Sequence, residues 1–362
     1  MGEAPTLIHI LTANRWGGIQ RYALDICRHF KENGWQVFAL TRGAKAVDSL
    51  FEDEGINLMH APFEGLLDPV SIRLLTKKIR TSPGQVVIHA HSFRKVCIAL
   101  IAKKLSRRKD VKVVVTRHKV KHGIDSWLFR NIYRNVDSIV FVSRIARDKF
   151  LETWKNFVPP FPDSRLHIVH NSIKLPKGPF LPVPESGPTI AMFHGPLEPG
   201  KGLETLIDAM VLLRGKRIRL RIVGSGQPDY TDKIRRRAIS KGVMDLIDWY
   251  GHTDDPFPLI QSSDFGVLPA TEAEAFGLSN IEFMALGRPQ ICSSNGAQPE
   301  YISDGVEGFL VKPGNPSSLA EKMMSLAGDP SLKDKMGRNA YESFNSRLSW
   351  PIFAERINSI YL

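Results

Sequence analysis

The chain has 362 residues, which is too long for one typical hydrophobic core and predicts two domains. Its 43% of hydrophobic and 24% of charged residues are typical of a soluble globular protein. No apolar stretch approaches the ~20 residues that a membrane-spanning helix needs, and the short run at 7–11 lacks the basic lead-in of a signal peptide. Three widely separated cysteines, Cys27, Cys97 and Cys292, argue against a disulfide framework, so we expect a cytoplasmic protein in a reducing compartment.

The positive charge is concentrated in the first half of the chain. Residues 1–177 contain 30 Lys/Arg and 15 Asp/Glu, whereas the remainder contains 19 and 22, so the net charge of +12 arises in the first half. Such asymmetry indicates an anionic partner: nucleic acid, anionic lipid or a phosphorylated acceptor. Nucleic acid is disfavoured, because no stripe of aromatic and basic residues and no known reader motif appears.

The first half alternates strand and helix patterns. Apolar residues from Ile19 to Phe30 recur on one helical face, and Gly34 closes this predicted helix. The predicted strands are residues 6–13, 37–40, 86–92, 111–118, 138–143 and 166–172. Helical stretches lie between most of them, which is typical of a doubly wound parallel sheet.

The alternation stops at a segment rich in proline and glycine and then restarts. Further strands are predicted at 189–195, 219–226, 264–270, 289–294 and 308–313, with helices at 202–213 and 229–242. We therefore predict an α/β protein with two Rossmann-like, doubly wound domains facing a central cleft. The predicted boundaries are 1–175 for the first domain, 176–188 for the linker and 189–347 for the second domain; an amphipathic helix follows at 348–362.

Ligands of open α/β sheets bind beyond the carboxyl ends of the strands, so candidate residues are sought there. Gly17 and Gly18 follow the first strand where a helix starts, and the backbone amides and helix dipole at such a place suit an anion. The alternative is that the two glycines only make a tight turn.

Two loops of the second half carry similar signals. Lys201 precedes a helix and can reach a phosphate there, although a solvated lysine is the alternative. Gly224, in the VGSG stretch after the next strand, is weaker evidence, because a plain loop explains it as well.

Histidines follow two strands of the first half. His118 stands at a strand end between Arg117 and Lys119, and neighbouring cations should favour its neutral form. A basic surface loop is the alternative, and His122 is a second candidate. The HAHS stretch at 89–92 places two histidines on one strand face, but no carboxylate or cysteine set completes a metal site.

The stretch EAEAFGLSNIEFMALGRP at 272–289 combines two carboxylates with an apolar helix. Glu282 lies within the helix, and a buried glutamate needs a partner, whereas Glu274 stands before the helix begins. Carboxylates accept hydrogen bonds from the hydroxyls of sugars and riboses, and the amides of Phe276, Gly277 and Leu278 can hold an anion. The alternative is that Glu282 only pairs with an arginine such as Arg288.

These motifs together resemble a known family. EAFGLSNIE at 274–282 is similar to the Glu–seven residues–Glu motif of retaining family 4 glycosyltransferases, which have the GT-B fold, and HGPLEPGKG at 194–202 looks like their phosphate-binding loop. The Gly-Gly pair, the HAHS strand, His118 and the stretches FVS, HNS and NGAQPEYISDGVEGFLV fall in the family's order and spacing. The resemblance covers nearly the whole chain.

The resemblance implies retaining transfer of a sugar from a UDP- or GDP-linked donor to a glycan or lipid-linked acceptor. Such reactions build cell-surface polysaccharide, lipopolysaccharide or glycolipid. The family needs no cofactor and no metal ion, and the donor would be held mainly by the second domain and the acceptor by the first. The helix at 348–362 would pack back on the first domain.

The resemblance also implies roles for single residues. Glu282 would hold the ribose hydroxyls, Glu274 the donor sugar, Lys201 and the amides near Gly18 the diphosphate, and His118 the transferred sugar near its reacting carbon. The implied catalytic set is His118, Glu274 and Lys201, and the implied donor-binding set is Gly17, Gly18, Arg15, Gly224, Phe276, Gly277, Leu278 and Glu282.

One position departs from the family pattern. Pro196 replaces the arginine of the phosphate loop and supplies neither a charge nor an amide donor, so Arg15, Arg144 or Arg288 would have to replace that contact.

Two other functions stay open: a nucleotide-sugar epimerase of the same fold, and a non-catalytic GT-B protein that binds nucleotide or membrane.

The basic segment 97–109 has two interpretations. It could be an amphipathic helix lying on anionic lipid, with the protein peripheral at the inner face of the plasma membrane. It could equally be a solvated helix whose apolar side packs on its own sheet.

Overall fold

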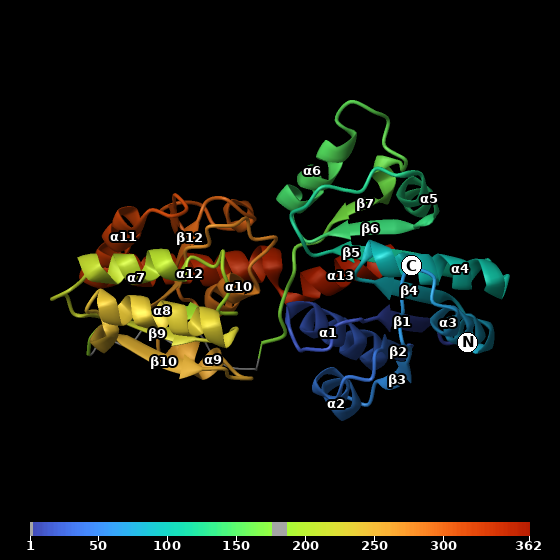
Figure 1. The fold of residues 1–362 in the computed structure, drawn as a ribbon, viewed down its shortest axis with the longest axis horizontal. Helices are drawn as coiled ribbons and strands as arrows, with labels where there is room; N and C mark the ends of the chain where they lie inside the picture. The colour runs from blue at the N-terminus through green and yellow to red at the C-terminus, as the bar shows by residue number, and fades with distance from the viewer. Residues whose placement is uncertain (1–2, 176–186) are drawn as a thin grey trace. The chain divides into compact units, whose positions relative to one another are not determined.

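A computed structural model describes residues 3–175 and 187–362, and most of the predicted linker 176–188 therefore lies outside the described residues. The chain forms two compact units, each drawn as one sheet with its helices in Figure 1. The first unit comprises Met1–Asn171 together with Trp350–Leu362, and the second comprises Ser172–Ser349. Three free cysteines, Cys27, Cys97 and Cys292, are buried.

The first unit is built on a seven-stranded parallel sheet in the order β3-β2-β1-β4-β5-β6-β7. Its strands are β1 Thr6–Ile10, β2 Gln36–Thr41, β3 Asn57–His60, β4 Val86–Ala90, β5 Val111–Arg117, β6 Ser138–Phe141 and β7 Leu166–Ile168. Its helices are α1 Gly18–Glu32, α2 Lys45–Asp53, α3 Pro69–Thr81, α4 Phe93–Ser106, α5 Trp127–Asn135, α6 Arg144–Leu151 and α13 Trp350–Tyr361.

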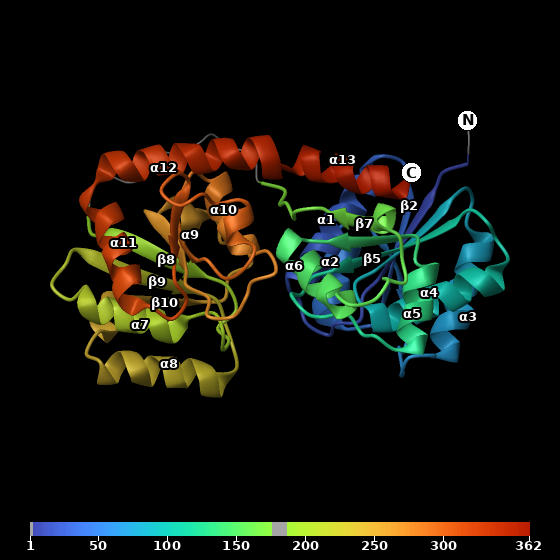
Figure 2. The same cartoon turned by 90° about the horizontal axis from the view of Figure 1, so that it is seen from above.

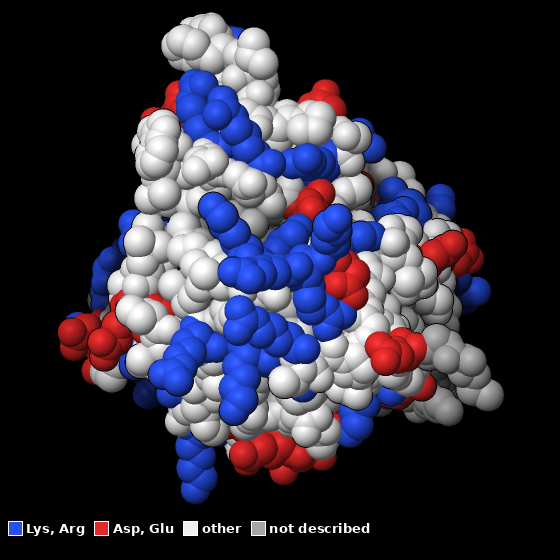
Figure 3. Space-filling model, turned by 90° about the vertical axis from the view of Figure 1, so that its right-hand side faces the viewer, with Lys and Arg blue, Asp and Glu red and all other residues white. Residues whose placement is uncertain are grey.

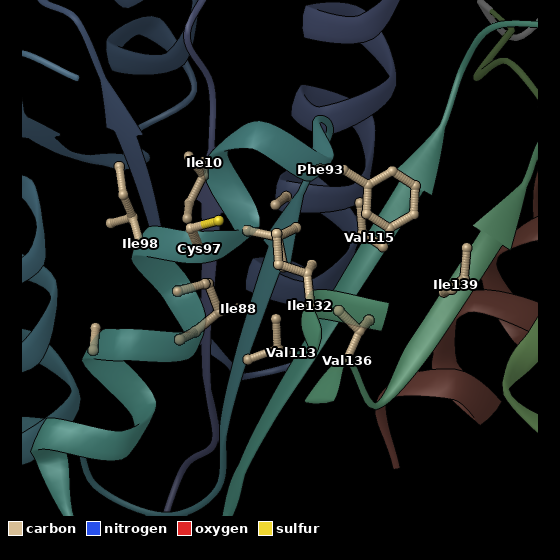
Figure 4. Packing of buried hydrophobic residues seen from close by; sticks show 14 of the residues in the cluster. Ile10, Ile88, Phe93, Cys97, Ile98, Val113, Val115, Ile132, Val136 and Ile139 are labelled. Carbon is tan, nitrogen blue, oxygen red and sulfur yellow. The ribbon is translucent and has the colours of Figure 1, made fainter. Parts of the chain in front are cut away.

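Helices cover both faces of this sheet, so the predicted doubly wound α/β architecture is confirmed. One core lies under α3, α4, α5 and α6, where the apolar side of α4 packs on the strands, as Figure 4 shows around Cys97 and Ile98. A second core lies under α1, α2 and α13. The apolar side of the basic segment 97–109 is therefore buried in its own unit, as the solvated-helix interpretation requires.

The second unit repeats this plan on a six-stranded parallel sheet in the order β10-β9-β8-β11-β12-β13. Its strands are β8 Thr189–His194, β9 Ile218–Val223, β10 Ile247–Gly251, β11 Phe265–Leu268, β12 Gln290–Ser293 and β13 Gly308–Val311. Its helices are α7 Leu203–Leu212, α8 Pro228–Ser240, α9 Phe257–Gln261, α10 Leu278–Ala285, α11 Pro316–Gly328 and α12 Pro330–Ser343. Figure 2 shows α7 and α8 on one side of the strands and α10 and α12 on the other.

Two strands were not predicted, β3 and β10. Both are edge strands of their sheets, and their residues are largely half-buried or exposed. They therefore lack the continuous apolar run that marks a central parallel strand.

Among the described residues, no helix has both the length and the apolar character that a bilayer crossing requires.

The centre of the first sheet contains buried imidazoles. His9 on β1 and His89 on β4 are register partners, and both are 0% exposed. The Nδ1 atom of His89 lies 2.5 Å from the hydroxyl of Tyr361 on α13, and its Nε2 atom lies 2.7 Å from Oγ1 of Thr116. Helix α13 is thus tied to the middle of the sheet by a polar contact as well as by the apolar core.

Burial of these rings makes the first unit sensitive to acid. Burial lowers the pKa of His9 to about 3, whereas a histidine in an unfolded chain has a pKa of about 6.5. Between these values the unfolded chain binds a proton that the folded chain does not, so the contribution of His9 to stability is complete above pH 6.5 and is lost as pH falls. Below about pH 6 we expect the unfolding free energy to decrease by about 1.4 kcal/mol per pH unit for this histidine alone, and by less between pH 7 and 6.

Denaturant unfolding of the chain at pH 7, 6 and 5 measures this slope. In the His9→Asn variant the unfolding free energy should depend less steeply on pH than in the native chain, because one proton fewer is taken up on unfolding. Equal slopes in the two proteins, or a stability that does not change between pH 7 and 5, would contradict the assignment.

Candidate active site

The second unit buries the Glu282 carboxylate at the end of a strand. Glu282 on α10 is 2% exposed, and its Oε2 atom lies 3.0 Å from Nδ1 of His194, the last residue of β8. The His194 side chain is 18% exposed, so the pair is largely shielded from solvent. Both side chains belong to the second unit, which places a carboxylate that can accept hydrogen bonds at the end of β8.

Helix α10 begins at Leu278, and Gly277 stands directly before it with a positive φ of 85°. No side chain caps this end, and the first turn carries no acidic residue. The hydroxyl of Tyr301 donates to the carbonyl of Phe276 and accepts from Nδ2 of Asn280, at 2.5 and 3.1 Å. The amides of Phe276, Gly277 and Leu278, which were predicted to bind an anion, therefore lie at a helix N-terminus. The Tyr301 hydroxyl holds this end of the helix, and the end is suited to an anion.

Lys201 and Glu274 form an ion pair between Nζ and Oε1. Their side chains are 24% and 15% exposed, so the pair is partly shielded from solvent. The backbone next to Lys201 packs closely against the segment that follows β11. A Cβ on Gly202 would lie only 1.8 Å from the carbonyl oxygen of Pro269, so a larger residue does not fit there. Glu274 and Glu282 thus lie beside different basic side chains. The loops that carry Lys201 and Glu274 contact each other without a ligand.

Gly224 has a φ of 142°, and a Cβ there would lie 1.9 Å from the carbonyl oxygen of Gly195. The loops that follow β8 and β9 are therefore in contact, and Leu197 donates its amide to the carbonyl of Ser225 at 2.9 Å. This packing alone explains the glycine, so the role of Gly224 in donor binding stays a prediction.

The first unit places Gly17 and Gly18 where the sequence predicts them. Gly17 is the residue before α1, Gly18 is its first residue, and Arg15 in the preceding loop is exposed. Gly17 has a φ of −177°, an extended conformation that any residue adopts, and a Cβ there would contact only Oε1 of Gln20, at 3.4 Å. Backbone strain therefore does not require this glycine, and its role in binding an anion stays a prediction.

His118 is half-buried just after β5, and its Nε2 atom lies 3.1 Å from Nδ1 of His91. Burial lowers its pKa to about 3, so the ring is neutral as predicted. The predicted cause was wrong, however. Lys119 is exposed, and Arg117 donates to the backbone carbonyl of His122 at 2.6 Å, so desolvation rather than the neighbouring cations holds His118 neutral.

No role was predicted for His9 or His194. His9 lies inside the apolar run of β1, where a polar residue is itself a signal. Its Nδ1 atom lies 3.0 Å from Nε2 of His91, which depends on the side-by-side placement of β1 and β4.

One suggested replacement for the arginine missing at Pro196 is wrong. Arg288 is 0% exposed and donates to the carbonyl of Gln261 at 2.7 Å, so it is a core residue that does not reach a ligand. Pro196 itself is exposed in the loop after β8. Arg15, which is exposed beside Gly17, is compatible with a role in binding an anion.

Comparison with known proteins identifies both halves of the chain. Residues 16–176 match the family model "Glycosyltransferase Family 4", and residues 182–343 match the model "Glycosyl transferases group 1". An uncharacterized glycosyltransferase of Methanocaldococcus jannaschii is 25% identical over 361 residues, which cover 95% of this chain and 94% of the relative.

Solved structures share the fold over the whole length. A glycosyltransferase from Rickettsia africae has a TM-score of 0.84 at 19% identity, covering 99% of this chain and 98% of that chain. The Anabaena protein HepE, in complex with UDP and glucose, has a TM-score of 0.81 at 18% identity, covering 98% of each chain. The chain therefore belongs to the family 4 glycosyltransferases with the GT-B fold and is an enzyme of that class.

Proposed function

We propose that this glycosyltransferase moves a sugar from a nucleoside-diphosphate sugar to a hydroxyl group of a glycan or lipid-linked acceptor, with retention of anomeric configuration and without a metal ion. The observation that carries the proposal is the arrangement around α10. The buried Glu282 carboxylate, an uncapped helix N-terminus and the Lys201–Glu274 pair all lie at the carboxyl ends of strands in the second unit.

Each of these groups suits one part of such a donor. Glu282 offers a desolvated acceptor to the paired hydroxyls of a ribose, and the imidazole of His194 lies beside it. Glu282 lies four residues after Leu278, so one helical turn of about 6 Å separates the carboxylate from the anion-binding amides. That spacing is compatible with a ribose at one end of the turn and a phosphate at the other.

Charge develops on the diphosphate during transfer. The bond from the anomeric carbon to a diphosphate oxygen breaks, a bond to the acceptor oxygen forms on the same face, and the acceptor's hydroxyl proton leaves with the diphosphate. Lys201 and the amides of α10 supply positive charge for that leaving group, and Glu274, which pairs with Lys201 when no ligand is bound, accepts hydrogen bonds from the hydroxyls of the donor sugar. The UDP and glucose in HepE, which shares the fold, agree with a donor of this kind.

We also propose that the first unit rests on an anionic membrane surface. Residues 69–81 and 93–109 carry eleven lysines and arginines and no acidic residue. Figure 3 shows basic side chains gathered on the face of the first unit where α3 and α4 lie. Since the apolar side of α4 is buried in the core, the attraction is electrostatic and no helix is inserted.

Nucleotide binding tests the donor site. Titration calorimetry with UDP and GDP in the presence of EDTA should show binding of one of the two, and Glu282→Gln should weaken it by roughly 10- to 100-fold, because a hydrogen bond to a charged group is worth about 1.5–3 kcal/mol. Glu321→Gln on the exposed surface of α11 is the matched control and should bind like the native chain. Undiminished binding by Glu282→Gln would contradict the ribose contact.

The second test separates the phosphate from the sugar contact. Lys201→Met should weaken binding of the nucleoside diphosphate by roughly 10- to 100-fold while leaving binding of the free nucleoside unchanged. Glu274→Gln should keep the affinity for the diphosphate but lose transfer activity, measured with the complete sugar donor. A loss of nucleoside affinity in Lys201→Met would show that the lysine supports the fold of the site and not the diphosphate.

Vesicle sedimentation tests the membrane surface. Each basic residue near an anionic surface contributes about 1 kcal/mol, so replacing Lys77, Lys104 and Lys109 by serine should weaken binding to vesicles of anionic lipid by about 100-fold. The control replaces Lys216 and Lys241, exposed cations of the second unit, and should leave binding unchanged. Equal binding to neutral and anionic vesicles would contradict the proposal.

A further inference from the structure

Three histidines of the first unit form a line of rings joined edge to edge. His118 Nε2 lies 3.1 Å from His91 Nδ1, and His91 Nε2 lies 3.0 Å from His9 Nδ1. Both pairs have ring centroids 5.3 Å apart, and the planes of His9 and His91 differ by only 11°. This centroid distance equals the sum of one nitrogen–nitrogen contact and two ring radii, so the facing nitrogen atoms lie on the line between the ring centres. That alignment is the geometry of an N–H···N hydrogen bond.

A metal site is the competing interpretation of the same cluster. His9, His89 and His91 offer one nitrogen each within 4.8 Å of one another. However, both nitrogens of His89 already contact hydroxyl groups, those of Tyr361 and Thr116. Both nitrogens of His91 are used by the line of rings, so a metal ion would have to break several existing contacts.

The buried end of the line fixes where the protons are. All three rings are neutral, because burial lowers the pKa of His9 and His118 to about 3 and that of His91 well below its ordinary value. The Nε2 atom of His9 is buried and has no hydrogen-bond partner among the described residues. A buried N–H group without a partner is rarer in proteins than a buried acceptor without one, so the proton of His9 belongs on Nδ1.

The proton on His9 then determines the other two rings. His9 donates from Nδ1 to Nε2 of His91, so neutral His91 carries its proton on Nδ1 and donates it to Nε2 of His118. His118 must therefore carry its own proton on Nδ1. This atom is the open end of the line: it takes no part in the contacts between the rings and is not among the buried unpaired atoms.

We propose that His91 and His9 are positioning residues that hold His118 as its Nδ1–H tautomer, so that His118 presents a hydrogen-bond donor to an oxygen atom of a bound sugar. The last part rests on the proposed function, whereas the tautomer itself does not. In this form His118 neither accepts a proton at Nδ1 nor acts as a general base there. It can only orient the ligand and stabilise an oxygen on it.

The tautomer is read directly by 15N-edited NMR of the histidine-labelled chain, without any substrate. We expect His118 to show a protonated Nδ1 and an unprotonated Nε2. His91→Asn keeps an N–H group near the position of Nδ1 and should preserve this pattern, whereas His91→Leu should release His118 to the other tautomer. A protonated Nε2 in the native chain, or an unchanged pattern in His91→Leu, would overturn the proposal.

Steady-state kinetics provides the second readout. His91→Leu should lower kcat by roughly 10- to 100-fold, because displacing a contact group by about 1 Å can reduce the rate by ~100-fold, and His91→Asn should recover most of the loss. His60→Asn, a change at an exposed histidine at the end of β3, is the control and should leave kcat unchanged. Equal losses in His91→Asn and His91→Leu would contradict the positioning role. Absence of transfer by the native chain would refute the proposed function, while the NMR pattern would still decide the tautomer.

Discussion

The proposed binding site of the second unit depends on a carboxylate that is buried within an apolar helix. Six of the eight residues of α10 are buried, and Glu282 is one of them. A buried carboxylate is unfavourable unless neighbouring groups compensate it, so the stability of this helix depends on the groups around Glu282, of which the His194 imidazole is one. A site that must be compensated in this way is well suited to bind a group rich in hydroxyl donors.

The surroundings prevent α10 from relaxing away from this position. Gly277 has a φ of 85°, and a Cβ there would lie 2.9 Å from Nδ2 of Asn280, so the turn that begins the helix favours glycine. Asn280 is held in turn by the hydroxyl of Tyr301 and by the Cys292 thiol, which donates to its Oδ1 at 3.3 Å. The geometry of the site is therefore set by the core before a ligand arrives, and this preorganisation lowers the entropic cost of binding.

The sequence predicts most of this arrangement, because central parallel strands and buried helices have strong apolar patterns. It places Glu282 in a buried helix and Glu274 before it, as the structure does. It does not reveal that His194 contacts Glu282, since that contact joins segments 88 residues apart. The line of rings that begins at His9 depends on strand order and register, which apolar periodicity does not encode. The neutrality of His118 was predicted for the wrong reason, because burial is a property of the packed sheet and not of neighbours in the sequence.

A crystal structure of the chain with bound UDP or GDP, grown in the presence of EDTA, would show whether Glu282 binds the ribose. We expect the carboxylate of Glu282 to accept hydrogen bonds from two ribose hydroxyls while the phosphates lie at the amides that begin α10. A nucleotide bound elsewhere, or one whose ribose makes no hydrogen bond to Glu282, would contradict the proposed site.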